Sequence, residues 1–299
     1  MSFILSFGTS GDGQLGNGAD SDDSPPICIV VPRGIKIVAL SAGSRHSLAL
    51  TSNGAVYSFG WGVLGQLGLG NCLNALSPTR IQDLKNVVEI SAGGMHSGCV
   101  TSDHKCYTWG SNGYGQLGVI LPHAPDSEPV DFSSVPMQVY CSKTSGTSAD
   151  INHTPLLAKH LSCGGMHSGA IDIDGNVWCW GRADSGQIGF ATKKLIAIAR
   201  ILSGTVVPTP YLLQNAIRGK GKTISCGAFH TLILNEDGVA YAMGKDDFGM
   251  LGSISDVNDC MTSGYDRPTV VYKLNGTTIT DVCTGIIMIH IVYRSVKYV

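Results

Sequence analysis

Four histidines recur in one motif, and their side chains are the first candidates for catalytic residues. His46, His96, His167 and His230 each end a Gly-x-x-His segment. An imidazole titrates near physiological pH and is a common general acid or base. An active site needs one such group, whereas these histidines recur once per segment, each before a small residue and an apolar run. We therefore interpret them as structural residues that bridge neighbouring backbones, and we predict no catalytic residue.

Five glycine motifs could be mistaken for nucleotide-binding loops. In each, a second and a third glycine follow the first by 5 and 8 residues, and the first glycines are Gly8, Gly60, Gly110, Gly181 and Gly244. A phosphate-binding loop needs G-x-G-x-x-G at a strand-to-helix junction, or a lysine after its last glycine. Here glutamine or methionine follows the second glycine in every motif. We expect these glycines to serve tight turns and close backbone approach, and we predict no cofactor.

The cysteines show no metal-binding or disulfide pattern. No two stand at C-x-x-C spacing, and the cysteine and histidine positions form no short ligand set, so we predict no metal site. We interpret Cys163, Cys226 and Cys283 as small core residues at one position of the repeated unit. Reduced thiols, together with a start that shows no signal peptide, favour a cytoplasmic or nuclear protein.

The composition excludes several other classes of protein. Of the 299 residues 39 are glycine, 14% are charged and 43% are hydrophobic, which is the opposite of a disordered chain. A net charge of −2 argues against polyanion binding, so we expect no specific nucleic-acid binding. The longest apolar stretch, 195–207, contains Arg200 and is shorter than the roughly 18 residues of a membrane span, so no membrane partner is expected.

Each Gly-x-x-His segment lies at a constant distance before a glycine motif, and this span predicts a β-hairpin. The four histidines each stand 14 residues before the first glycine of the next motif. Pairs that favour type I′ turns divide three of these spans: Asn53-Gly54, Asp174-Gly175 and Asp237-Gly238. The second unit has Asp103-His104 at this place, a weaker turn former. With the apolar runs that precede each histidine, such as 35–40 and 87–90, each unit has three or four strands.

The units differ in length outside this constant core. Successive histidines lie 50, 71 and 63 residues apart, which places insertions at about 119–152 and 190–219. Antiparallel units of this size are typical of β-propeller blades. The Gly-x-x-His segment, the glycine motif and a strand that ends in Trp-Gly or Phe-Gly together resemble the regulator-of-chromosome-condensation repeat family. This resemblance extends from Phe7 to about Gly285. We therefore predict an all-β fold, a single propeller domain over 1–299 with about five units.

The ends of the chain suggest two forms of the ring. The strand 3–8 begins inside a unit, and the run 280–288 begins another unit in which Met288 takes the histidine position. The degenerate tail 286–299 lacks the expected turn and the closing glycine strand. The N-terminal strand could complete that last unit and close a five-bladed ring, which would remove exposed sheet edges. The alternative is an incomplete ring that remains an open arc.

Positions that vary between units are the candidates for partner recognition. The residues before the four histidines are Arg45, Met95, Met166 and Phe229, and the loops after the strand-ending glycines add Trp61, Arg182, Asp184 and Asp246. Equivalent positions in a ring point to one face, so we predict that these residues form a partner-binding face. Aromatic, methionine and arginine side chains are enriched at protein interfaces. The alternative is that the methionine and phenylalanine side chains pack between blades.

These observations favour a non-enzymatic module that binds a protein partner through one loop-rich face. The resemblance implies a second hypothesis, guanine nucleotide exchange on a small GTPase, which acts by differential binding and makes no bond. Asp184 and Asp246 are the acidic candidates for that activity by position. A third hypothesis is an accessory repeat domain, or a fragment, of a larger ligase or kinase regulator.

Overall fold

The computed structural model describes most of the chain, and every regular element in the described part is a β-strand. The described residues are 4–20, 26–29, 34–121, 131–142, 154–189, 206–247, 249, 251–252, 265–271, 278–285 and 289–293. Large parts of the two predicted insertions, 122–130, 143–153 and 190–205, lie outside them, as does most of the tail 286–299.

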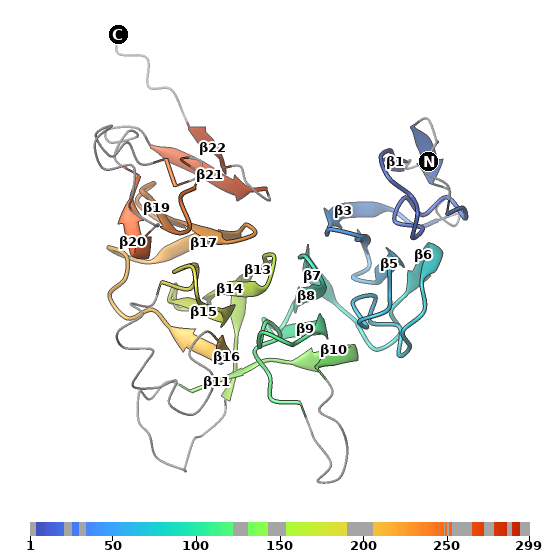
Figure 1. The fold of residues 1–299 in the computed structure, drawn as a ribbon, viewed down its shortest axis with the longest axis horizontal. Coiled ribbons are helices and arrows are strands. Elements are labelled where there is room, and N and C mark those ends of the chain that lie inside the picture. The colour runs from blue at the N-terminus through green and yellow to red at the C-terminus, as the bar shows by residue number, and fades with distance from the viewer. Residues whose placement is uncertain are drawn as a thin grey trace.

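Four blades of four antiparallel strands form the body of the molecule (Figure 1). The first blade has β3 (Ile37–Ala42), β4 (His46–Thr51), β5 (Val56–Gly60) and β6 (Ala75–Arg80), and the second has β7 (Val87–Ala92), β8 (His96–Thr101), β9 (Cys106–Ser111) and β10 (Phe132–Gln138). The third has β13 (Ala158–Cys163), β14 (His167–Asp172), β15 (Val177–Arg182) and β16 (Val206–Leu212), and the fourth has β17 (Gly221–Cys226), β18 (His230–Asn235), β19 (Ala240–Gly244) and β20 (Tyr265–Val270). The predicted hairpin is present in every blade, because each motif histidine pairs with the first glycine of the next motif.

Two-stranded sheets lie at both ends of the chain and beside one insertion. The N-terminal half-sheet is β1 (Ile4–Ser6) with β2 (Ile27–Ile29), and the C-terminal half-sheet is β21 (Ile279–Thr284) with β22 (Ile289–Tyr293). The third is β11 (Tyr140–Cys141) with β12 (Thr154–Pro155). By position in the repeat, β1 and β2 are the third and fourth strands of a blade, and β21 and β22 are the first and second.

The ring is open. In the described residues the two half-sheets do not pair with each other, and Figure 1 shows them apart at the open side of an arc. Of the two predicted forms, the structure has the open arc, and within the described part of the chain the N-terminal strand does not pair with the last unit. The rotation from blade to blade is set by the packed junctions, and four full blades with two half-sheets leave the ends separated.

The hairpin turns differ from the predicted type I′ geometry, which requires positive φ at both central residues. Gly54 has φ 76°, but Asn53 is not among the positive-φ residues. Gly54 N–H donates to Thr51 O and Thr51 N–H donates to Ala55 O, both at 2.9 Å, which makes a three-residue loop with a glycine bulge. The prediction was wrong because the loop is longer than the Asn-Gly pair. In the second hairpin His104 adopts the left-handed conformation at φ 64°.

The hydrophobic core is divided into clusters that lie between neighbouring blades. One cluster joins Leu50 of the first blade to Ile90 and Trp109 of the second. The indole N–H of Trp109 donates to Gln66 O at 2.9 Å, and a Cβ on Gly68 would lie 2.8 Å from that indole nitrogen. The third glycine of this motif is therefore required, because a large side chain of the next blade packs directly on it.

Candidate functional site

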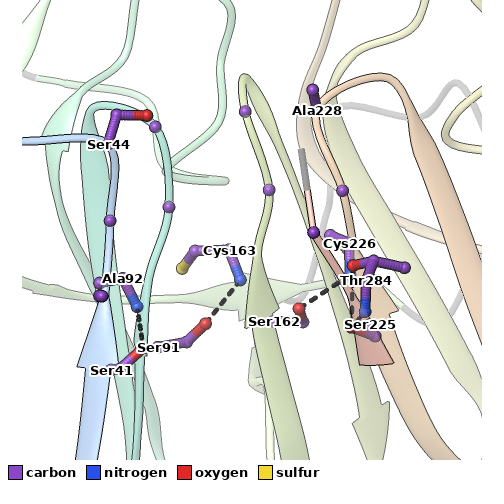
Figure 2. Close-up of a pocket in the computed structure, with 18 residues that line it drawn as sticks. Ser41, Ser44, Ser91, Ala92, Ser162, Cys163, Ser225, Cys226, Ala228 and Thr284 are labelled. Carbon is purple, nitrogen blue, oxygen red and sulfur yellow. Dashed lines mark hydrogen bonds between the residues drawn. The ribbon is translucent and has the colours of Figure 1, made fainter. Parts of the chain in front are cut away.

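The first strands of the blades, with β21, line a central channel with a cavity of about 420 Å³. Its lining consists of serine, glycine, alanine, cysteine and threonine, so no charged side chain among the described residues lines it. Figure 2 shows a ladder of hydrogen bonds in which a serine hydroxyl of one blade accepts from a backbone N–H of the next. The pairs, at 2.9 to 3.0 Å, are Ser41 with Ala92, Ser91 with Cys163, Ser162 with Cys226, and Ser225 with Thr284.

This ladder corrects one prediction from the sequence. Thr284 occupies the place that Cys163 and Cys226 hold in the third and fourth blades, since all three donate their backbone N–H to the serine before them in the arc. Cys283 is therefore one position away from the buried cysteines, and it is exposed. The prediction was wrong because it aligned the units by their cysteines. The equivalent residue is the one directly before the first glycine of the Gly-x-x-His segment, and in the last unit this residue is Thr284.

The motif histidines join each blade to the next through a hydroxyl. His46 Nε2 lies 2.8 Å from Ser97 Oγ in the second blade, and Ser97 donates its hydroxyl proton to Gln66 O in the first blade at 2.8 Å. Because that proton is already donated, His46 Nε2 must carry the hydrogen of the His46–Ser97 bond. The same relay runs from His96 through Ser168 to Gln116 O, and from His167 through Thr231 to Gln187 O.

Burial keeps these imidazoles neutral. Desolvation lowers the pKa of His46 to about 4 and contributes most to the lowering of the pKa of His96 and His167 to about 3. All three side chains are buried between blades. An uncharged imidazole that is enclosed and donates its Nε2 hydrogen to the neighbouring blade is a clamp in the fold, and a substrate has no access to it.

Arg182 connects residues of three blades on the face that carries the Gly-x-x-His loops. Its guanidinium lies 5.1 Å from the ring centre of Tyr114 in the second blade and 5.3 Å from that of Phe229 in the fourth. Both are cation–π distances. Arg182 also donates to Asp184 at 2.9 and 2.6 Å, and to Met166 Sδ at 3.4 Å. Four of the residues predicted for the partner-binding face therefore meet in one group, which we call the Arg182 cluster together with Tyr114.

Arg45 and Trp61 form a second pair of the predicted residues. The Arg45 guanidinium lies 4.9 Å from the ring centre of Trp61, and its Nε donates to Asp12 Oδ2 at 2.7 Å. Met95 stands 37% exposed at the same loop position of the second blade. Asp246 is engaged in its own loop, because its Oδ1 accepts from Leu251 N–H at 2.9 Å.

Tyr114 and Asp12 were missed by the reasoning from the sequence. Each is the residue just before the second glycine of its motif, and each contacts the arginine of a following blade. The variation at this motif position, aspartate in one unit and tyrosine in another, is the signal that could have found them. Lys245 also lies 5.8 Å from the Phe229 ring and forms an ion pair with Asp247.

The described part of the chain holds neither a metal-binding cluster nor a membrane-spanning helix. No three His, Cys, Asp or Glu side chains in this part gather to hold a metal ion. The described residues also contain no helix that is long and apolar enough to cross a membrane.

Antiparallel four-stranded blades around a channel, each carrying the same two motifs, define a repeat protein of the β-propeller class. The family model described as the regulator of chromosome condensation (RCC1) repeat matches residues 3–50, 53–100, 103–171 and 174–234. A second model of this repeat matches 37–66, 87–116 and 222–249. The chain belongs to the RCC1 repeat family.

The chain spans only part of the curated relatives that it matches. The E3 ubiquitin-protein ligase HERC2 of Homo sapiens is 29% identical over 283 residues, which are 94% of this chain and 5% of HERC2. The ultraviolet-B receptor UVR8 of Arabidopsis thaliana is 29% identical over 257 residues, which are 86% of this chain and 52% of UVR8.

Solved structures show the same fold. Human WBSCR16 matches with a TM-score of 0.74 at 22% identity, over 97% of this chain and 67% of that one. Prp20p from Saccharomyces cerevisiae, described with its binding properties to Gsp1p and histones, matches with a TM-score of 0.69 at 24% identity, over 90% of this chain and 59% of that one.

Proposed function

We propose that this chain is a non-enzymatic module that binds a protein partner through the face bearing Arg45, Met95, Met166 and Phe229. The Arg182 cluster is the observation that supports this most, because aromatic, methionine and arginine side chains of three neighbouring blades meet there. Such side chains contribute most of the binding energy at protein interfaces. They also differ from unit to unit, whereas the residues that clamp the blades together repeat.

The local charge balance supports a partner that is recognised by apolar and aromatic contacts. Arg182 pairs with Asp184, Arg45 with Asp12, and Lys245 with Asp247. These pairs leave rings and methionine side chains as the groups that a partner can cover. The buried motif histidines offer no acid or base for bond-making chemistry, which supports binding as the activity.

Affinity capture with two matched variants tests the proposal. Met95→Glu places a charge on the proposed face, and Val88→Glu places the same charge on an exposed apolar residue of β7 in the same blade. We expect Met95→Glu to lower the yield of captured partner at least tenfold and Val88→Glu to leave it unchanged, at equal melting temperatures. Equal yields from both variants would contradict the proposal.

Guanine nucleotide exchange on a small GTPase is the second candidate. It is supported by the likeness to Prp20p, whose description concerns binding to Gsp1p. Asp184 is the acidic candidate on the face, where it is exposed and paired with Arg182. Release of labelled GDP from a panel of small GTPases tests it, with Asp184→Asn as the variant. Release at the intrinsic rate with every GTPase of the panel rejects this candidate and leaves the first one standing.

A further inference from the structure

A second cavity lies in the second blade, at the end of the strands opposite to the Gly-x-x-His loops. It has a volume of about 400 Å³ and lies between the loop 81–86, which leads into this blade, and the hairpin turn that joins β8 to β9. Carboxylates, ammonium groups and hydroxyls around it can both donate and accept hydrogen bonds. The lining residues are Asp83, Leu84, Lys85, Asn86, Thr101, Ser102, Asp103 and Tyr107.

Several polar side chains of this cavity have no partner within the described part of the protein. Asp103 forms an ion pair with Lys105 at 2.8 Å. Among the described residues, however, no hydrogen bond or ion pair engages the carboxylate of Asp83, the ammonium group of Lys85 or the hydroxyl of Tyr107. These three groups are therefore available to a ligand, and few convergent polar groups in a cavity are typical of a binding site.

The fourth blade fills the equivalent place with its own backbone. Tyr241 corresponds to Tyr107, because each stands eleven positions after its motif histidine on the third strand of its blade. The Tyr241 hydroxyl accepts the backbone N–H of Arg218 at 3.0 Å, and Asn235 Nδ2 donates to Arg218 O at 2.8 Å. Both main-chain polar groups of one residue are thus bound at the place where the second blade has a cavity.

The length of the preceding loop explains this difference between the blades. The loop 213–220, between β16 and β17, has eight residues, whereas the loop 81–86, between β6 and β7, has six. In both blades the last residue of the loop accepts a backbone N–H of the hairpin turn, at 2.9 and 2.8 Å. Asn86 ends the shorter loop in the left-handed conformation at φ 55°, which asparagine adopts more readily than most residues. The second blade therefore lacks the stretch of backbone that would cover Tyr107.

We propose that this cavity binds a short peptide segment of a partner protein through its main chain. One residue of the segment takes the place that Arg218 holds in the fourth blade, and its N–H donates to the Tyr107 hydroxyl. A carbonyl group of the segment accepts from Lys85, and a basic side chain of the segment pairs with Asp83. This inference does not depend on the proposed function, because the loop-bearing face lies at the other end of the strands.

The lining favours a peptide over a metal ion or a phosphate. No three His, Cys, Asp or Glu side chains of the described residues gather here to hold a metal ion. A phosphate would be repelled by Asp83 and Asp103, and hydrogen bonds from Lys105 and Thr101 lower the pKa of Asp103 to about 2, so it is ionised. Each residue of a peptide carries one N–H donor and one C=O acceptor, which match a free hydroxyl and a free ammonium group.

A peptide with the sequence of residues 215–220, acetylated and amidated at its ends, is the probe. An NMR titration of the full chain with millimolar peptide measures its binding, and we expect the largest shifts at the amides of Ser102 and Asp103. Tyr107→Phe should weaken binding at least fivefold, because it removes the hydroxyl that accepts from the peptide. Tyr140→Phe is the matched control and should leave binding unchanged, because Tyr140 is 41% exposed and does not line the cavity.

A loop-exchange variant tests the same site independently. It replaces residues 82–86 by the sequence of residues 214–220, so that the second blade carries the longer loop of the fourth. We expect this variant to lose peptide binding and to melt at the temperature of the wild type or above it, because its own backbone then fills the cavity.

Any of four results overturns the proposal. Unchanged spectra with millimolar peptide would show that the cavity takes up no peptide. Equal affinity of the wild type and Tyr107→Phe would show that the tyrosine hydroxyl is not the acceptor. Peptide binding that the loop-exchange variant retains would place the site elsewhere. Binding of argininamide as tight as that of the peptide would show that a cation, and not a main chain, is recognised.

Discussion

A buried imidazole that donates to a hydroxyl of the next blade couples its ionisation to the integrity of the arc. His46, His96 and His167 each make this bond at 2.8 Å. Protonation of any of them would place a charge between two blades, where no carboxylate is among the relay partners. The residue that looks most catalytic in the sequence is therefore the one whose neutrality the fold requires.

Acid should destabilise the protein well above the range in which carboxylates titrate. The folded pKa is about 4 for His46 and about 3 for His96 and His167, against 6.5 when unfolded, so the unfolded state binds more protons below pH 6.5. The free energy of unfolding should fall by up to about 4 kcal/mol per pH unit as the pH drops from 6.5 toward 4. His160 has the opposite sign, because the side-chain hydrogen bond of Glu89 raises its pKa, but it is partly exposed and contributes little.

Urea titrations at pH 7, 6 and 5 measure this dependence. His96→Gln keeps an N–H donor and does not titrate, so its slope against pH should be about a third smaller than that of the wild type. Equal stability of the wild-type protein at pH 7 and pH 5 would contradict the neutral buried histidines.

Gly65 tests the role of the motif glycines. It has φ 73°, and a Cβ there would lie 2.6 Å from Ser133 O in the next blade. Gly65→Val should lower the free energy of unfolding by about 2–5 kcal/mol, from backbone strain and overpacking. Gly113 is a matched control in the following motif, because a Cβ there meets no atom within 4 Å and its φ is not positive. Gly113→Ala should leave the melting temperature unchanged or slightly raised. Equal losses of stability in both variants would contradict the requirement for glycine at position 65.

At the scale of the elements, the hydroxyl on the second strand of each blade holds two blades together. Ser168 bridges His96 and Gln116 O, whereas Ser47, at the same place in the first blade, donates to Gln14 O at 3.0 Å. The N-terminal half-sheet before Ser47 has no Gly-x-x-His loop among its described residues.

Ser168→Ala should therefore lower the free energy of unfolding more than Ser47→Ala does. The first leaves the buried Nε2–H of His96 without its acceptor, at about 1–3 kcal/mol, while Gln116 O keeps the indole N–H of Trp180. The second removes a donor from the partly buried carbonyl of Gln14 and leaves no imidazole N–H without a partner. Guanidinium unfolding of the two variants measures the difference. A larger loss in Ser47→Ala would show that the histidine relay does not stabilise the junction.

At the scale of the whole molecule, the arc resembles a linear array more than a closed ring. Each blade contacts its neighbours, so stability is shared along the array and is lowest at its free ends. Amide hydrogen exchange should be slowest in β8 and β14, which have a full blade on both sides, and fastest in β1 and β22. Protection of β1 equal to that of β8 would contradict an open arc in solution.

The sequence by itself determined the repeat and the hairpin boundaries, whereas the predicted five units are four full blades and two half-sheets in the described residues. Glycine spacing and the histidine position are local requirements, because a left-handed residue or a close backbone approach excludes other residues wherever it occurs. The motif from His96 to Gly110 therefore predicted the pairing of β8 with β9 without knowledge of any other blade.

The tertiary structure alone decided the open arc, the turn type and the membership of the Arg182 cluster. Whether a ring closes depends on the sum of the rotations at all junctions, which no single motif encodes. Tyr114 and Phe229 flank Arg182 from two different blades, 68 positions before and 47 positions after it along the chain. Such contacts depend on how neighbouring blades pack and on side-chain conformation, so only the tertiary structure shows which residues contact Arg182.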